Sequence, residues 1–293
     1  MKGKIIKIVS QYYYVLATDE IVCCNLRGKL RQEQVSPLVG DIVEYEKKDE
    51  GKGLITKVFA RKNQLLRPPV ANLSQVIVVS SLKNPLFDFK FVDKILVHAE
   101  REKLKIIICV TKIDLAATSE DFKFLKKIKD VYNKAGYKVV TFSIYNNKDI
   151  LEVEKHLKDN VSVLAGKSGV GKTSLLQKLF PERNLVIGDI SYKLKSGKHT
   201  TRHVELFSLS NGGQVVDTPG FSKLAFDGFG LTEIAAYFNE FKKYKNRCYF
   251  KGCLHLNEPK CAVKDAVLCG LISKERFESY CQFINILQKN KKY

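Results

Sequence analysis

The sequence predicts a P-loop α/β domain, flanked by an N-terminal all-β barrel of the OB-fold type and a C-terminal, mostly α, zinc-binding domain. Three observations lead to this prediction. Short apolar runs with strand character alternate with helical segments through the middle of the chain, which is typical of a parallel α/β sheet. A phosphate-binding motif lies at residues 166–173. Three cysteines and a histidine gather at residues 248–261.

The N-terminal 66 residues are dominated by short β-branched and aromatic runs that are separated by turns. The expected strands are residues 5–9, 12–16, 21–24, 39–45 and 54–58. Short strands at this spacing suit a small barrel such as an OB-fold. The sequence Arg-Pro-Pro at residues 67–69 interrupts the pattern and marks a linker, so we expect the first domain to be residues 1–66.

Residues 67–222 alternate between apolar strands and helices. The expected strands are residues 75–80, 105–110, 139–142, 161–165 and 213–216, and the expected helices are residues 89–103, 122–135, 150–157 and 173–180. Strands that are apolar along their whole length are typically buried on both faces of a parallel sheet. We therefore expect one α/β domain over this range.

The pattern changes after residue 222. We expect helices at residues 233–244 and 273–289, on either side of an irregular loop at residues 247–261. Residues 223–293 therefore form the third expected domain.

Residues 166–173 read Gly-Lys-Ser-Gly-Val-Gly-Lys-Thr and match the G-x-x-x-x-G-K-[ST] pattern of the P-loop. The match lies between an expected strand and an expected helix, which is the context that the motif requires. Backbone N–H groups of such a loop and the N-terminus of the following helix bind phosphate groups. Lys172 should contact the β- and γ-phosphates, and the Thr173 hydroxyl should bind Mg²⁺.

Two further motifs concern the base and the γ-phosphate, and their order along the chain is unusual. Residues 111–114, Thr-Lys-Ile-Asp, fit the guanine-binding pattern [NT]-K-x-D, in which Asp114 would accept two hydrogen bonds that adenine cannot donate. Residues 217–220, Asp-Thr-Pro-Gly, fit the D-x-x-G motif that senses the γ-phosphate. An ordinary GTPase has the P-loop first and the guanine motif last. The sequence therefore predicts an α/β P-loop GTPase domain that is circularly permuted.

Another base contact is expected after the strand at residues 139–142. Ser143 stands where an S-A-x motif usually contacts the base, although Ile144 departs from its Ala. The residues that we assign to the nucleotide and its Mg²⁺ are Thr111, Lys112, Asp114, Ser143, Gly166, Lys167, Ser168, Gly169, Val170, Gly171, Lys172, Thr173, Ser174, Asp217 and Gly220.

A switch threonine is expected between the P-loop and the D-x-x-G motif. Thr200 and Thr201 are both candidates, and we favour Thr201. Phe221 stands where Ras-like enzymes have the Gln that orients the attacking water, so intrinsic hydrolysis should be slow. His199 is our first candidate for orienting the water and a partner-supplied group is the second; an ordinary surface histidine is the alternative. The predicted catalytic residues are Lys172, Thr201 and His199.

The C-terminal loop carries three thiols and one imidazole within fourteen residues. Zn²⁺ takes such a set in closed, structural sites, whereas unconnected free cysteines are the alternative. The predicted zinc ligands are Cys248, Cys253, His255 and Cys261. Cys269 is a possible substitute for His255, but it lies in an apolar run, and we expect it, like Cys281, in the core.

The chain has 50 Lys and Arg against 31 Asp and Glu, for a net charge of +19. The basic residues are spread over the whole chain, which favours a polyanionic partner, most simply a large RNA, over a bias of the proteome toward lysine. No apolar run approaches the ~20 residues that span a bilayer, so no membrane contact is expected. The N-terminus has no signal-peptide pattern, and we expect a cytoplasmic protein.

With these motifs in hand, the chain closely resembles the RsgA (YjeQ/YloQ) family of circularly permuted GTPases, which act in the biogenesis of the small ribosomal subunit. The resemblance covers nearly the whole chain and includes the sequence Arg-Pro-Pro-Val-Ala-Asn at residues 67–72. It implies GTP hydrolysis stimulated by the small subunit, binding to its rRNA and a late maturation step. The implied cofactors are GTP or GDP, Mg²⁺ and one structural Zn²⁺. We assume a monomer.

Three alternatives stay open at this point. A large-subunit assembly GTPase of another permuted family is disfavoured by the N-terminal barrel and the zinc cluster. A nucleic-acid-binding module with a vestigial P-loop is disfavoured by intact Lys172, Thr173 and Asp217. An ATP-dependent kinase is disfavoured by Asp114, which predicts guanine.

Overall fold

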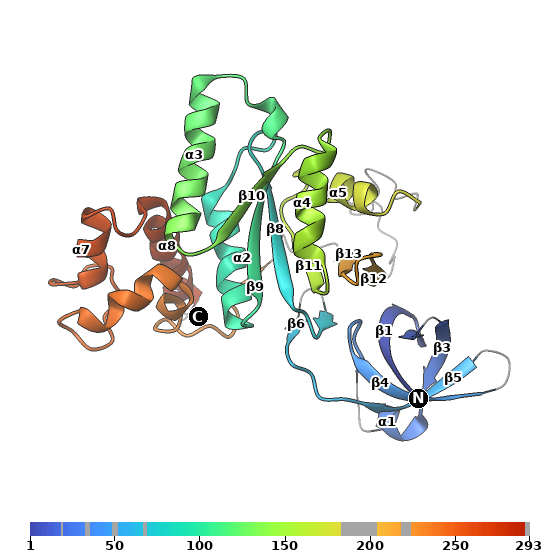
Figure 1. Cartoon of the computed structure of the whole chain (residues 1–293). Coiled ribbons are helices and arrows are strands. Elements are labelled where there is room, and N and C mark those ends of the chain that lie inside the picture. The colour runs from blue at the N-terminus through green and yellow to red at the C-terminus, as the bar shows by residue number, and fades with distance from the viewer. Residues whose placement is uncertain are drawn as a thin grey trace. The chain divides into compact units, whose positions relative to one another are not determined.

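A computed structural model describes residues 1–18, 20–32, 36–48, 52–66, 69–182, 204–217 and 224–290 (Figure 1). The chain divides into two compact units that are each built from separate stretches of sequence. The first unit comprises Met1–Val76, Ile150–Leu164 and Thr173–Phe221. The second comprises Ile77–Asp149, Ala165–Lys172 and Ser222–Tyr293.

The N-terminal strands of the first unit form a closed barrel (Figure 1). The strands are β1 (Lys2–Val9), β2 (Tyr12–Ala17), β3 (Glu20–Leu26), β4 (Ile42–Lys47) and β5 (Lys52–Val58), with a short helix α1 (Gly28–Gln32) after β3. They follow the order β1-β2-β3-β5-β4, and β1 also pairs with β4, which closes the sheet. Ile5, Val15 and Ile55 are fully buried. The predicted OB-type barrel is confirmed.

Three more strands of the first unit continue this sheet. β13 (Gln214–Asp217) pairs in parallel with β11 (Val161–Ala165) and antiparallel with β12 (Glu205–Ser208), a strand that the sequence did not predict. β12 also pairs with β1 through Lys7 and Glu205. A small antiparallel pair is formed by β6 (Gln64–Leu66) and β7 (Pro69–Ala71). Of the predicted linker, Pro69 is the first residue of β7, and residues 67 and 68 lie outside the described ranges. α4 (Asn147–Leu157) and α5 (Lys172–Leu179) are close to their expected bounds.

The second unit contains the strands that precede the guanine motif. β8 (Gln75–Ser81), β9 (Lys105–Thr111) and β10 (Lys138–Phe142) lie in the order β10-β9-β8, and β9 and β10 are parallel. α2 (Phe89–Arg101) follows β8, and α3 (Ser119–Lys134) follows β9. Asp88 is the N-cap residue of α2, and its carboxylate accepts a hydrogen bond from the Phe91 N–H at 3.0 Å. A capping box of Thr118 and Asp121 starts α3.

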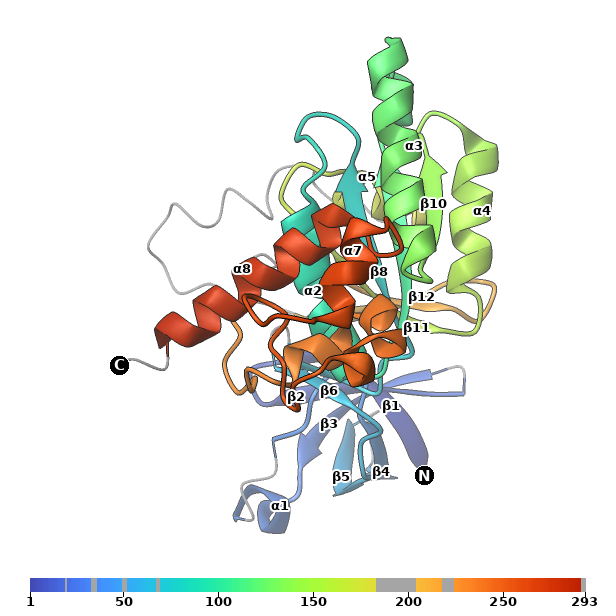
Figure 2. The same cartoon turned by 90° about the vertical axis from the view of Figure 1, so that its left-hand side faces the viewer.

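The C-terminal part packs around buried aromatic side chains that include Phe238, Phe241, Tyr280 and Phe283. The predicted helix at residues 273–289 is confirmed as α8 (Lys274–Asn290), and a short helix that the sequence did not predict, α7 (Ala262–Leu268), precedes it. Both follow the irregular loop at residues 247–261. α8 packs against α2 (Figure 2).

The predicted helix at residues 233–244 is wrong. Short 3-10 turns replace it: η4 (Ile234–Tyr237), η5 (Asn239–Lys243) and then η6 (Lys245–Arg247). Phe238 separates the first two with extended dihedrals, φ −99° and ψ 101°. The apolar residues of this stretch have the sequence spacing of a helix. The backbone instead forms two consecutive 3-10 turns, η4 and η5, and the side chains of Phe238 and Phe241 are both buried.

A fully buried arginine joins α8 to α2 and η5. The Arg276 guanidinium donates to Asp93 Oδ1 at 2.7 Å and to Glu240 Oε1 at 2.7 Å, and it lies over the Phe238 ring at 4.5 Å. The Tyr132 hydroxyl of α3 donates to Asp93 Oδ1 at 3.0 Å. Burial opposes the charged guanidinium, but the two carboxylates raise the pKa of Arg276 well above its ordinary value.

We predict that Arg276→Ala lowers the free energy of unfolding by about 3–5 kcal/mol, because it leaves two carboxylates buried without their counter-ion. Urea unfolding followed by circular dichroism measures the change. Lys274→Ala on the same helix is the control, because that side chain is 80% exposed, and it should change stability by less than about 0.5 kcal/mol. Equal stabilities of the two variants would contradict the structural role of Arg276.

Candidate nucleotide and metal sites

The P-loop follows β11 and leads into α5, as the motif predicts. Gly166 allows the loop to pass close to β8: a Cβ atom at this position would lie 2.1 Å from the Val79 carbonyl oxygen. Gly169 and Gly171 have positive φ angles of 79° and 99°, which favour glycine. The Lys172 ammonium donates to the carbonyl oxygens of Gly166 at 2.8 Å and of Lys167 at 2.6 Å. The loop therefore curves around the charge that is expected to contact phosphates.

The guanine motif lies directly against this loop. The Thr111 hydroxyl donates to the Val170 carbonyl oxygen at 2.6 Å, and the Lys112 ammonium donates to the Gly169 carbonyl oxygen at 2.7 Å. Lys112 also donates to the Asn84 carbonyl oxygen and has left-handed dihedrals, φ 57° and ψ 36°. Two motifs that are separated by more than fifty residues are thus joined within one unit.

Asp114 and Ser143 follow neighbouring strands of the same sheet. Thr111 and Phe142, the last residues of β9 and β10, are register partners, so both motifs lie at the carboxyl edge of the sheet, where α/β proteins bind ligands. The Ser143 N–H donates to Asp149 Oδ2 at 2.9 Å, and Ser143 Oγ accepts from the Tyr145 N–H at 3.2 Å. The Asp114 carboxylate is exposed, and the described residues donate no hydrogen bond to it.

An ion pair fixes another residue of the P-loop. The Lys167 ammonium lies 2.5 Å from Asp88 Oδ2, at the start of α2. Burial alone would raise the pKa of the Asp88 carboxyl, but the bond from Lys167 and the N–H groups of α2 hold it below its ordinary value. No motif predicts the contacts of Asn84 and Asp88; the signal for them in the sequence is that polar residues follow the apolar strand β8.

The other predicted nucleotide and switch residues follow the P-loop lysine along the chain. Thr173 and Ser174 are half-buried in the first turn of α5, and Asp217 is the last residue of β13. His199, Thr201 and Gly220 lie outside the described residues, as do Thr200 and Phe221. Their functions stay predictions.

The four predicted metal ligands converge in the C-terminal loop. Donor atoms of Cys248, Cys253, His255 and Cys261 all lie within 4.8 Å of one another. Cys248 Sγ is 3.5 Å from His255 Nδ1 and 3.9 Å from Cys261 Sγ, and His255 Nδ1 is 3.3 Å from Cys261 Sγ. Tetrahedral zinc with bonds of about 2.0–2.3 Å separates its ligands by roughly 3.5–3.8 Å. The cluster is therefore compatible with zinc.

One of the other two C-terminal cysteines differs from expectation. Cys269 is exposed and is not part of the cluster, so it does not replace His255, and the prediction of a core position is wrong. It is the C-cap residue of α7 and lies in a run of exposed residues, 268–271. Cys281 is half-buried and packs against the aromatic core, in agreement with its expected position.

Comparisons with known proteins agree with these observations. The family model of the RsgA N-terminal domain matches residues 2–55, and that of the RsgA GTPase matches residues 58–227. The small ribosomal subunit biogenesis GTPase RsgA of Alkaliphilus metalliredigens is 42% identical over 294 residues, which cover 100% of this chain and 99% of the relative. The protein of the same name from Geobacillus thermodenitrificans is 43% identical over 290 residues, which cover 99% and 98%.

Two solved structures extend the similarity to the fold of the whole chain. The crystal structure of YloQ, described as a circularly permuted GTPase, has a TM-score of 0.84 and 35% identity and covers 99% of this chain and 95% of its own. The crystal structure of YjeQ from Thermotoga maritima has a TM-score of 0.85 and 35% identity and covers 97% of each chain.

No helix within the described ranges combines the length and apolar character that a bilayer span requires. The joined nucleotide motifs, the barrel and the matches over nearly the full length lead to one conclusion. The chain belongs to the RsgA family of circularly permuted GTPases and is a GTP-hydrolysing enzyme.

Proposed function

We propose that this GTPase binds the small ribosomal subunit through its rRNA and acts in late maturation of that subunit, with hydrolysis stimulated by the subunit. The observation that carries the proposal is the 42% identity, over the full length, to a protein named small ribosomal subunit biogenesis GTPase. The net charge of +19 supports an RNA partner. A monomer that acts in the cytoplasm is part of the proposal.

The proposed nucleotide site uses the residues around the P-loop. Lys172 contacts the β- and γ-phosphates, the Thr173 hydroxyl binds Mg²⁺, and Asp114 accepts hydrogen bonds from guanine. The Lys172 ammonium lies within the loop, against the carbonyl oxygens of Gly166 and Lys167, and this position supports a role for the loop in holding phosphates. Further proposed contacts to the nucleotide and Mg²⁺ come from Thr111, Lys112, Ser143, Gly166, Lys167, Ser168, Gly169, Val170, Gly171, Ser174, Asp217 and Gly220. Bound Mg²⁺ neutralises charge that develops on the phosphates.

We propose domain boundaries at residues 66 and 222, so that the D-x-x-G motif leads directly into the C-terminal domain. A shift of Gly220 that depends on the γ-phosphate would then reach the zinc-binding part and its partner. Because the affinity for the nucleotide and the affinity for the partner are reciprocally linked, the GTP form should bind small subunits more tightly than the GDP form.

In the C-terminal domain we propose one structural Zn²⁺, held by Cys248, Cys253, His255 and Cys261.

The test of the proposed function is GTP turnover alone, with small subunits and with large subunits. Phe221 cannot orient water, so we expect slow intrinsic turnover and a stimulation of more than about tenfold by small subunits alone. His199→Ala should remove most of that stimulation and leave GDP affinity unchanged. Stimulation by large subunits would instead support the alternative of a large-subunit assembly factor, and no stimulation by either would contradict the proposal.

The proposed zinc predicts about one metal ion per chain in the purified protein. Cys261→Ser should reduce that content to near zero and lower the unfolding temperature, because a buried ligand of the cluster is lost. Cys269→Ser is the matched control and should change neither quantity, since that thiol is exposed and lies outside the cluster. Elemental analysis and thermal unfolding give both readouts. A Cys261→Ser protein with full metal content, or with unchanged stability, would refute the site.

A further inference from the structure

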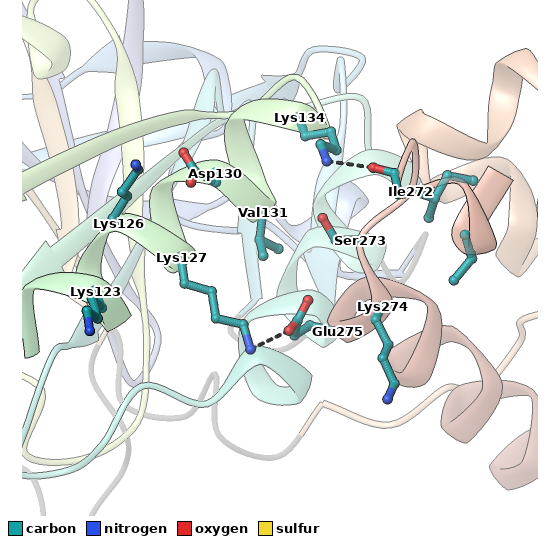
Figure 3. A pocket seen from close by; sticks show the side chains of 12 residues that line it. Lys123, Lys126, Lys127, Asp130, Val131, Lys134, Ile272, Ser273, Lys274 and Glu275 are labelled. Atoms are coloured by element: carbon teal, nitrogen blue, oxygen red, sulfur yellow. Dashed lines mark hydrogen bonds and ion pairs between the residues drawn. The ribbon is translucent and has the colours of Figure 1, made fainter. Parts of the chain in front are cut away.

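An open groove of about 410 Å³ lies between α3 and the turn that joins α7 to α8, all within the second unit (Figure 3). We call it the lysine groove. Its charged lining residues are Lys123, Lys126, Lys127, Asp130, Lys134, Lys274 and Glu275. Its apolar lining includes Val131 and Ile272. Five lysines against two acidic residues give this surface a strong positive charge.

Two of these lysines have a structural role. The Lys127 ammonium lies 2.5 Å from Glu275 Oε1, and the Lys134 ammonium donates to the Gly270 carbonyl oxygen at 2.6 Å (Figure 3). Both contacts tie α3 to the segment around the start of α8. The two walls of the groove are therefore held in place by the chain itself.

Two other lysines are left available for a ligand. Lys123 and Lys126 are exposed and three residues apart on α3, and neither has an ion pair or hydrogen bond to any described residue. Lys274 has only a long contact of 3.8 Å, to Glu278. The available charges thus come from both walls of the groove.

The spacing of these charges is unfavourable for α3 alone. Lys123 and Lys126 are three residues apart, so two unpaired like charges adjoin on one helix face, whereas the charge of Lys127 is paired with Glu275. Asp130 offsets only part of this repulsion. A bound polyanion would neutralise it, and the apolar surface at Val131 can pack against the aliphatic parts of lysine side chains.

We propose that the lysine groove binds the phosphate backbone of RNA, with Lys123 and Lys126 contacting phosphate groups. The inference rests on the proposed function, because it assigns part of the rRNA contact to a defined surface. Adjacent ammonium groups in an open groove match a chain of phosphates better than a single enclosed anion. Because α3 and the start of α8 both line the groove, RNA bound there contacts the GTPase part and the C-terminal part together.

The test compares two double variants by their salt dependence of binding. Lys123→Gln with Lys126→Gln removes the two available charges of the groove. The control variant, Lys155→Gln with Lys158→Gln, removes two other exposed lysines at the same spacing. Lys155 forms an exposed ion pair with Glu152 at 3.2 Å. Affinity is measured between about 50 and 200 mM salt for purified small subunits and for their deproteinised rRNA.

Each lost phosphate contact reduces the slope of log affinity against log salt by roughly 0.7–0.9. The groove variant should therefore lose about 1.4–1.8 from the slope on both probes, so that wild type loses roughly tenfold more affinity than the variant over this salt range. The control variant should keep the wild-type slope. Thermal unfolding of both variants should match wild type, because the groove lysines that are replaced have no described partner.

Equal slopes for the two variants would overturn the inference, since binding would then depend only on overall charge. A loss on small subunits but not on rRNA would also overturn it, because the groove would then contact a ribosomal protein. Failure of wild type to bind small subunits, with the groove effect intact on rRNA, would contradict the proposed function and leave the groove supported. The proposed function and the RNA-binding role of the lysine groove can thus be contradicted independently.

Discussion

Two hydrogen bonds from consecutive side chains hold the nucleotide motifs of this GTPase in one place. Thr111 and Lys112 donate to the carbonyl oxygens of Val170 and Gly169, so the guanine motif is attached to the P-loop itself. These hydrogen bonds join the end of β9 to the P-loop. They require only that the two segments lie close together in space, whatever their order along the chain. The reversed order of the motifs along the chain is therefore compatible with the site geometry of an ordinary GTPase.

Permutation gives each motif new neighbours along the chain. The D-x-x-G motif now precedes the C-terminal part, whose aromatic core packs on α2 of the second unit. Arg276 fixes this contact with two buried carboxylates, one from α2 and one from η5. Lys167 of the P-loop is paired with Asp88, the N-cap residue of the same helix. α2 thus contacts both the nucleotide loop and the C-terminal part.

The sequence predicts those parts of the molecule that local chemistry determines. Apolar runs specify β8, β9 and β11, and the glycine spacing specifies the P-loop. The Cys and His spacing predicts the cluster, which the structure brings together. The apolar residues around Phe238 have helical spacing, so the sequence predicts a helix there. The structure has turns instead, because the packing of the aromatic core selects the extended dihedrals of Phe238.

Other features depend on residues far apart in the sequence. Arg276 looks like a surface residue of α8, and it is buried because Asp93, 183 residues away, and Glu240, 36 residues away, surround it. The strand β12 has four residues and forms by pairing with β1 and β13. The two bonds between the guanine motif and the P-loop likewise have no signal in either motif alone.

The central claim is that the guanine motif and the P-loop form one guanine nucleotide site. Calorimetric titration with GDP and ADP tests it, on wild type, on Thr111→Val and on Thr141→Val, a half-buried threonine of β10 as control. We expect GDP to bind far more tightly than ADP. Thr111→Val should weaken GDP binding by about five- to 150-fold, because the Val170 carbonyl loses its donor, and the control should match wild type. Equal affinity for ADP, or full GDP affinity in Thr111→Val, would contradict the account.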